Sequence, residues 1–207
     1  MGISEGLIKA ARDLPPWKAE YHPYIPSHWW VEGRMTNLYK AVLWSWGREG
    51  KLVIDVGCGL GENLSQLHLE LYDSRSGTPH FVGLEVNPIL CEQANLYKSH
   101  TFGNNYYEII NEDAFEHSFE LYDRVYTYCP INNLDLCSKL YKKIFQELPI
   151  GARWFEFLGL DALVGRLNPE SKSFFGDIGH IIKTGYDQLQ SISFKVSIKS
   201  EVEEVRI

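Results

Sequence analysis

Three carboxylates and one glycine-rich segment are the residues of this 207-residue sequence whose types and spacing could do chemistry. Asp55, Glu85 and Asp113 each lie at the end of a short apolar run, and glycines alternate through residues 57–61. Carboxylate oxygens accept hydrogen bonds from hydroxyl and amine groups. A glycine-rich turn brings backbone N–H groups close to an anionic ligand, and the following helix adds its positive N-terminal end. This combination favours a nucleotide-cofactor site.

The glycine spacing distinguishes between two kinds of cofactor. A dinucleotide fingerprint, Gly-x-Gly-x-x-Gly, that starts at Gly57 or Gly59 needs a third glycine where this chain has Glu62 or Leu64. The order Asp-x-Gly-x-Gly-x-Gly over residues 55–61 instead resembles the first motif of the class I S-adenosylmethionine (SAM) dependent methyltransferases. An ordinary glycine-rich turn between a strand and a helix is the alternative.

The resemblance covers about residues 50–158 and implies a role for each acid. Asp55 would anchor the amino-acid end of SAM, and Glu85 would accept from both ribose hydroxyls. Asp113 would accept from the adenine amino group, with the adjacent backbone N–H and the apolar side chains of Ala114 and Phe115 completing the pocket. The residues that the resemblance assigns to SAM, or to the product S-adenosylhomocysteine (SAH), are Asp55, Gly57, Cys58, Gly59, Gly61, Asn63, Glu85, Val86, Asp113, Ala114, Phe115 and Tyr128.

Each acid also has a purely structural interpretation. Asp55 could cap the turn, Glu85 could be a solvated acid at a helix N-terminus, and Asp113 could belong to a plain acidic turn. Glu112 competes with Asp113 for the adenine role, and Asp113 is preferred because the order Asp-Ala-Phe matches the family segment.

The fourth predicted strand ends in Tyr128-Cys129-Pro130-Ile131. Methyltransferases that act on exocyclic amines of bases often carry Asp or Asn, two prolines and an aromatic residue there, so the departure disfavours a nucleic-acid acceptor. By the resemblance, Tyr128 would lie beside the transferred methyl, where a ring face favours the sulfonium and an incoming amine. The open alternative is that Tyr126 and Tyr128 only pack the strand. Cys129 lacks an identifiable histidine partner and is interpreted as a small buried residue.

Residues 1–35 form an aromatic and proline-rich leader, in which tryptophan, tyrosine and histidine crowd positions 17–30. We expect this leader to be a cap over the acceptor, although a strap packed on the sheet is equally compatible with it. If the acceptor arrives protonated, a base is needed, and the candidates by position are His22, His28, Glu32 and Tyr128.

The alternation of apolar strands and amphipathic helices predicts an α/β fold. Specifically, we expect a doubly wound, mostly parallel seven-stranded sheet with a C-terminal antiparallel hairpin, in a SAM-binding methyltransferase domain over residues 36–207 that follows the N-terminal aromatic-rich cap of residues 1–35. Asn87 is expected to cap a helix that begins at Pro88, and residues 201–204 to be a solvated terminus. The expected strands are 52–56, 81–85, 107–110, 124–128, 153–158, 174–183 and 191–199; the expected helices include one capped by Thr36 or Asn37 and others around 64–71 and 137–148.

Composition excludes few classes of function. The chain has 20 basic and 27 acidic residues, a net charge of −7 and a pI near 5.5. This balance disfavours a nucleic-acid partner, because a protein that binds nucleic acid needs a basic surface. The four cysteines form no Cys-x-x-Cys pair and are expected to be reduced thiols without a metal site. No run reaches membrane-spanning length and no basic leader opens the chain, so a cytoplasmic protein is expected.

The sequence therefore predicts a SAM-dependent methyltransferase that acts on a nucleophilic N, O or S atom of a small molecule. The run 82–88 also resembles segments of some seven-strand protein-lysine methyltransferases, which makes a protein the alternative acceptor. A SAM-binding regulatory or interaction module without catalysis is a further alternative, because no catalytic side chain is required by the sequence.

Overall fold

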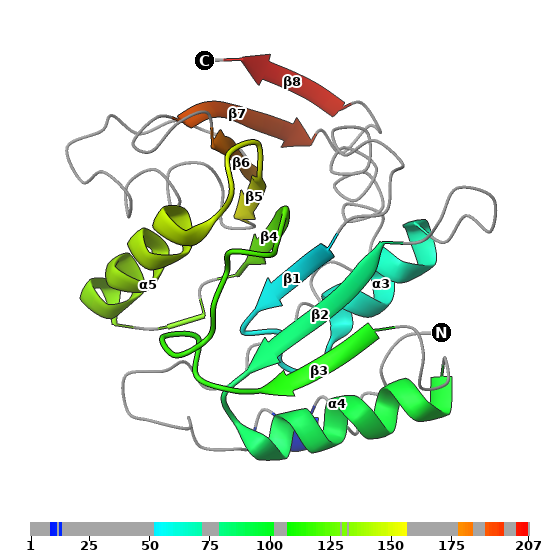
Figure 1. The fold of residues 1–207 in the computed structure, drawn as a ribbon. Helices are drawn as coiled ribbons and strands as arrows, with labels where there is room; N and C mark the ends of the chain where they lie inside the picture. Colours follow the sequence, from blue (N-terminus) through cyan, green and yellow to red (C-terminus); the bar gives the residue numbers. More distant parts are fainter. Residues whose placement is uncertain are drawn as a thin grey trace.

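The computed structural model describes residues 9–11, 13, 52–71, 79–101, 107–128, 130–131, 133–156, 178–183, 189–196 and 202–206. These ranges form one sheet with helices on both faces (Figure 1). The elements are β1 Leu52–Val56, α3 Glu62–Leu71, β2 His80–Glu85, α4 Pro88–Thr101, β3 Tyr107–Asn111, β4 Arg124–Thr127, α5 Leu134–Glu147, β5 Arg153–Glu156, β6 Ile178–Lys183, β7 Leu189–Val196 and β8 Val202–Arg206.

The strand order in the sheet is β3-β2-β1-β4-β5-β6-β7-β8. The first five strands in this order are parallel, and β6, β7 and β8 join them antiparallel. The chain runs outward from β1 to β3 and then crosses back to β4, so the order reverses between β1 and β4. In a parallel sheet a ligand binds outside the carboxyl ends of the strands at such a reversal. The α/β class and the parallel arrangement expected from sequence are confirmed.

The C-terminal part of the sheet differs from the expectation. The described residues contain eight strands rather than seven, and a three-stranded antiparallel run of β6, β7 and β8 replaces the expected hairpin. The acidic segment expected to be a solvated terminus supplies most of β8. Because this segment is mostly charged, it lacks the apolar alternation by which a strand is predicted. Its pairing with β7 depends on backbone groups instead. Charged residues are common on an edge strand because they discourage pairing with another chain.

The leader lies almost wholly outside the described residues. Residues 9–11 are helical, and Ala11 is buried. The predicted cap over 1–35, its aromatic cluster and the helix expected after Thr36 or Asn37 remain predictions.

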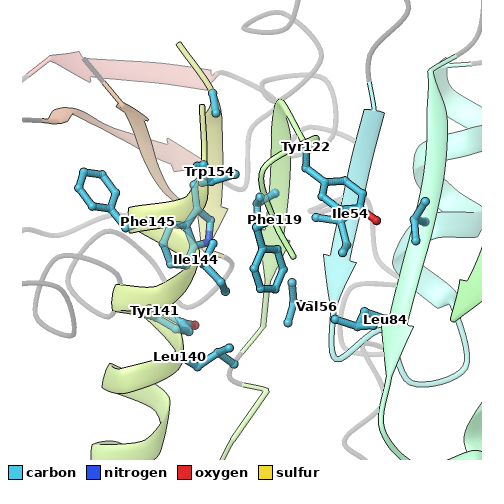
Figure 2. Close-up of a cluster of buried hydrophobic side chains, with 14 of the residues drawn as sticks. Ile54, Val56, Leu84, Phe119, Tyr122, Leu140, Tyr141, Ile144, Phe145 and Trp154 are labelled. Carbon is cyan, nitrogen blue, oxygen red and sulfur yellow. The ribbon is translucent and has the colours of Figure 1, made fainter. Parts of the chain in front are cut away.

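One hydrophobic core lies between α5 and one face of the sheet (Figure 2). Asn133 caps α5 by accepting from the N–H groups of Asp135 and Leu136, at 3.0 and 3.1 Å. Apolar residues then recur along one face of the helix, and the fully buried Tyr141 ring lies 4.9 Å from the Trp154 ring of β5. The core thus backs β1, β4 and β5, which pair in parallel, and the candidate site lies at the carboxyl ends of β1 to β4.

The opposite face is covered by α3 and α4. Gly83 in β2 has no room for a side chain, because a Cβ there would lie 2.6 Å from both the Cys58 sulfur and a methyl of Leu64. Asn87 caps α4 as predicted, accepting from the Ile89 N–H at 3.0 Å. The close approach of α3 to β2 brings the turn between β1 and α3 against the end of β2.

Candidate functional site

The glycine turn between β1 and α3 is held tightly on the end of β2. Gly57, Gly59 and Gly61 have φ of 76°, 56° and 74°, a left-handed conformation that glycine adopts at little cost. The N–H groups of Gly57 and Cys58 both donate to the Leu84 carbonyl, at 2.8 and 3.1 Å. The turn is therefore a preformed structure, and these two N–H groups face the protein rather than a ligand.

Gly57 also sets how closely the segment after β4 approaches the glycine turn. A Cβ at Gly57 would lie only 2.9 Å from the Cβ of Pro130, which follows β4. The absence of a side chain thus lets the segment after β4 pack directly on the glycine turn. Two stretches far apart in the sequence, the turn of residues 57–61 and the segment after β4, meet here.

Glu85 ends β2 and is buried, with 8% of its surface exposed. Its Oε2 accepts from the Gly59 N–H at 3.0 Å, and its Oε1 accepts from the Asn87 N–H at 2.9 Å. Burial raises the pKa of this carboxyl, and the backbone hydrogen bonds oppose the rise. The interpretation of Glu85 as a solvated acid is wrong, because the side chain is enclosed where the glycine turn meets β2.

Asp55 is the second buried acid of the site, with 1% of its surface exposed. It hydrogen-bonds to the Asn63 side chain, yet its Oδ2 is buried with no hydrogen-bond partner among the described residues. Burial, followed by the charge of Glu85, raises the pKa of Asp55 to about 7, and the bond to Asn63 opposes the rise. Within the described part of the chain, neither Asp55 nor Glu85 forms an ion pair.

Two adjacent buried carboxylates without a cation are costly for a folded protein. The cost falls when a positively charged group binds between or beside them, and the unpartnered Oδ2 of Asp55 offers such a group a hydrogen-bond acceptor. A diphosphate would meet repulsion at the same place. The electrostatics of the turn therefore favour a ligand that carries a cation.

Asn111 was missed by the sequence analysis, which ended the third strand at Ile110. Its side-chain NH₂ donates to the carbonyls of Glu85 and Val86, at 2.9 and 3.0 Å, so it ties the end of β3 to the end of β2. The Glu112 N–H adds a bond of 3.3 Å to the Glu85 carbonyl. An amide just before two acids was the available signal, because a buried strand end needs donors for its carbonyls.

The turn after β3 carries the residues expected to meet adenine. The Asp113 Oδ1 accepts from the Phe115 N–H at 3.1 Å, which shapes the turn locally. Ala114 and Phe115 are half-buried and pack against the core cluster. The Phe115 N–H is therefore already used, and the adjacent N–H of Ala114 is the remaining candidate donor for a base. The acidic-turn interpretation of Asp113 is correct locally and is compatible with a further role.

Tyr128 follows β4, which ends one residue earlier than expected. Tyr126 is fully buried and stacks on Phe155, with ring centroids 5.5 Å apart, so its role is packing. Tyr128 is half-buried at the carboxyl end of the strand. The other three candidate bases, His22, His28 and Glu32, lie outside the described residues, as does Cys129.

A buried carboxylate that the sequence analysis passed over lies at the end of β5. Glu156 is completely buried, and its Oε2 accepts from the Thr127 hydroxyl at 2.5 Å and from the Tyr141 hydroxyl. The Trp154 N–H donates to the same threonine oxygen at 2.8 Å. This network joins β4, β5 and α5 at Thr127, the residue before Tyr128, and the sequence did not reveal it because its members are far apart in the chain.

Among the residues that the structure describes, no cluster of three or more His, Cys, Asp or Glu could hold a metal ion. Cys58, Cys91 and Cys137 are buried free thiols, and burial raises the pKa of Cys91 to about 12. Within the same ranges, no helix is both long and apolar enough to span a membrane.

Comparison with known proteins places the fold. No family model and no curated protein sequence matches this chain. Among solved structures, an RNA methyltransferase from Salinibacter ruber in complex with SAH aligns with a TM-score of 0.52 and 19% identity over 71% of this chain and 90% of its own.

Two further alignments are shorter. A candidate sarcosine dimethylglycine methyltransferase from Galdieria sulphuraria aligns with a TM-score of 0.49 and 12% identity over 61% of this chain and 46% of its own. Phosphoethanolamine N-methyltransferase 2 from Haemonchus contortus, in complex with SAM, aligns with a TM-score of 0.45 and 20% identity over 58% of this chain and 27% of its own. This chain thus spans less than half the length of these two proteins. The likeness to the RNA methyltransferase, at 19% identity and a TM-score of 0.52, shows a shared fold.

Proposed function

We propose that this chain, which has the fold of the class I SAM-dependent methyltransferases, binds SAM and transfers its methyl group. The observation that carries the proposal is the pair of buried acids at the glycine turn, Asp55 and Glu85, where the Oδ2 of Asp55 has no hydrogen-bond partner among the described residues. SAM brings an ammonium and a sulfonium, whereas a dinucleotide brings a diphosphate. The cationic cofactor therefore relieves the charge of this site, and the dinucleotide adds to it.

The proposed binding mode uses lone pairs that the described contacts leave available. Asp55 accepts from the ammonium of SAM through Oδ2. Each oxygen of Glu85 accepts one backbone N–H and, as a carboxylate oxygen, retains a lone pair for a ribose hydroxyl. Asp113 accepts from the adenine amino group, and the Ala114 N–H donates to the ring. The adenine, ribose and amino acid thus follow the ends of β3, β2 and β1 in that order.

Methyl transfer is an in-line displacement that needs little covalent help from the protein. A lone pair of the acceptor forms the bond to the methyl carbon, the C–S bond breaks, and its electrons remain on sulfur to give neutral SAH. Positioning supplies most of the catalysis, and a base is needed only for an acceptor that arrives protonated. We assign the acceptor side to the segment after β4, where Tyr128 presents a ring to the sulfonium and His22 or His28 could take the proton.

We further propose a small molecule as the acceptor. The net charge of −7 opposes binding of a polyanion, and the end of β4 lacks the motif of base-amine methyltransferases. The run 82–88, which resembles segments of protein-lysine methyltransferases, forms the end of β2 and the cap of α4, and we propose that it contributes to the cofactor side. The leader of residues 1–35 is proposed as the wall that closes over the acceptor.

Two measurements test this function. Calorimetry should show micromolar binding of SAM and SAH and none of NAD. Methyl-labelled SAM should then label a deproteinised metabolite extract rather than the protein or RNA fraction of the same cells. Glu85→Ala is the binding-deficient control, and Glu108→Ala is its matched control, because the Glu108 side chain is 59% exposed near the opposite end of the adjacent strand.

Each outcome of these assays is informative. Label in protein or RNA would reassign the acceptor, and SAM binding without label in any fraction would indicate a non-catalytic SAM-binding module. NAD binding without SAM binding would refute the cofactor assignment.

A further inference from the structure

The turn after β3 is closed by His117, a residue that no part of the proposed mechanism uses. We call the contacts of His117 with Glu112 and Tyr122 the clasp. His117 lies five residues after Glu112, and its Nδ1 is 2.6 Å from the Glu112 Oε2. Because an ionised carboxylate only accepts, the proton of this bond belongs to Nδ1. The other ring nitrogen, Nε2, lies 3.1 Å from the Tyr122 hydroxyl. Both ring nitrogens are thus partnered, and the His117 side chain is only 12% exposed.

The clasp encloses the three residues assigned to adenine, 113–115. Inside it, the Asp113 carbonyl accepts from the N–H groups of Glu116 and His117, at 2.9 and 3.1 Å. The Asp113 Oδ1 holds the Phe115 N–H. The turn is therefore closed twice, once by its own backbone and once by the side chains of Glu112 and His117.

The far side of the clasp is fastened to α5. The Lys143 ammonium donates to the His117 carbonyl at 2.5 Å and pairs with Glu147, whose Oε2 accepts from the Phe119 N–H at 2.9 Å. Phe119 is fully buried in the core cluster, where Figure 2 shows it between α5 and β1. Its ring lies edge-on to the His117 ring, with centroids 5.5 Å apart. The histidine is thus attached to α5 and to the buried core cluster.

The clasp also distinguishes between two adjacent acids. Glu112 and Asp113 are both candidates to face a purine amino group, but the Glu112 carboxylate is drawn to His117. Asp113 lies in the turn itself, whose backbone is fixed by the bonds to its carbonyl and to its Oδ1. Without His117, the Glu112 side chain, which is 40% exposed, would be released and the turn would lose its side-chain closure.

We propose that His117 is a positioning residue for base selectivity: through Glu112 and Tyr122 it holds the 113–115 turn so that Asp113 selects a 6-amino purine. The inference rests on the proposed function, since it assumes that the adenine of SAM or SAH meets this turn. A purine with a 6-oxo group presents an acceptor to Asp113 in place of a donor, which sets two oxygens against each other and weakens binding.

The experiment compares the binding of SAH with that of S-inosylhomocysteine, its 6-oxo analogue. Wild-type protein should prefer SAH by about 50-fold, the range expected for one hydrogen bond to a charged acceptor. His117→Ala should reduce this preference to about fivefold or less. His117→Asn keeps a donor near the position of Nδ1 and should retain most of the preference, so it serves as the conservative rescue.

A second histidine provides a matched control. The His80 Nε2 lies 3.8 Å from the Glu108 Oε2 at the start of β2 and β3, away from the turn, and both side chains are largely exposed. His80→Ala should leave the preference unchanged. Hydrogen exchange without ligand adds a readout of the clasp itself: the amides of Glu116 and His117 should exchange faster in His117→Ala than in wild type or His80→Ala.

The outcomes separate this inference from the proposed function. An unchanged preference in His117→Ala, even with a lower melting temperature, would mean that His117 is merely structural and would overturn the inference alone. Equal binding of the two nucleosides by wild type would also overturn it while leaving SAM binding intact. Wild type that binds neither nucleoside would refute the proposed function and this inference together.

Discussion

Binding of SAH should be coupled to the release of a proton from Asp55. The carboxyl is buried, and its pKa in the free protein is raised to about 7. At pH 6 it is therefore mostly protonated, whereas the ammonium of the ligand needs the carboxylate. Binding below pH 7 must displace the proton, so the affinity should rise as pH rises through 7. The perturbations are pH itself and the substitution Asp55→Asn.

The size of the effect follows from that pKa. If the ammonium keeps Asp55 ionised in the complex, the Kd for SAH should be about eightfold weaker at pH 6.0 than at pH 7.5. The number of protons released on binding should be about 0.9 at pH 6.0 and about 0.2 at pH 7.5. The pKa of Glu85 is also raised, so a contribution of the same sign from Glu85 should remain in Asp55→Asn.

Calorimetry at pH 6.0 in two buffers with different ionisation heats gives the proton number directly, because the observed enthalpy changes in proportion to it. The matched ligand is 5′-methylthioadenosine, which keeps the nucleoside and thioether but lacks the amino acid. It should show much less proton release, as should SAH with Asp55→Asn. An SAH affinity that does not change with pH, or an equal proton number for the two ligands, would refute the assignment of Asp55 to the ammonium.

Three further predictions concern the same site. Glu85→Ala and Asp113→Ala should each weaken SAH binding by about 1.5 to 3 kcal/mol in folded protein, and unchanged affinity in both would contradict the assignment of the three acids. Gly57→Ala should lower the melting temperature more than Gly151→Ala. Both positions have positive φ, but a Cβ at Gly151 meets nothing within 4 Å, whereas one at Gly57 would lie 2.9 Å from the Cβ of Pro130. Equal falls in melting temperature would argue against that contact. A carboxyl whose pKa is raised on folding stabilises the protein below its unfolded pKa and loses that contribution as pH rises through the folded value. The free energy of unfolding of the ligand-free protein should therefore fall by about 1.4 kcal/mol between pH 6 and 8 because of Asp55. Chemical unfolding of Asp55→Asn should show a smaller fall over the same pH range.

The parallel strands were readable from the sequence because their signals are local. Short apolar runs bounded by glycine, proline or acid predicted β1 to β5 within a few residues, and Asn87 before Pro88 predicted the start of α4. The strand β8 could not be predicted in this way. Its residues are mostly charged, and its existence depends on the free edge of β7, which only the assembled sheet provides.

For the site, the sequence by itself determined which residue types stand at the strand ends, and hence the expectation of a cofactor rich in hydroxyl and amine donors. Only the tertiary structure decided their state. Asp55 and Glu85 became two neighbouring buried acids because β1 and β2 are adjacent in the sheet, and the described ranges place no cation beside them. The contacts of His117 with Glu112 and Tyr122, and of Glu156 with Thr127 and Tyr141, likewise depend on how separate segments pack. Burial and partner choice are properties of packed neighbours, and no pattern along one chain specifies them in advance.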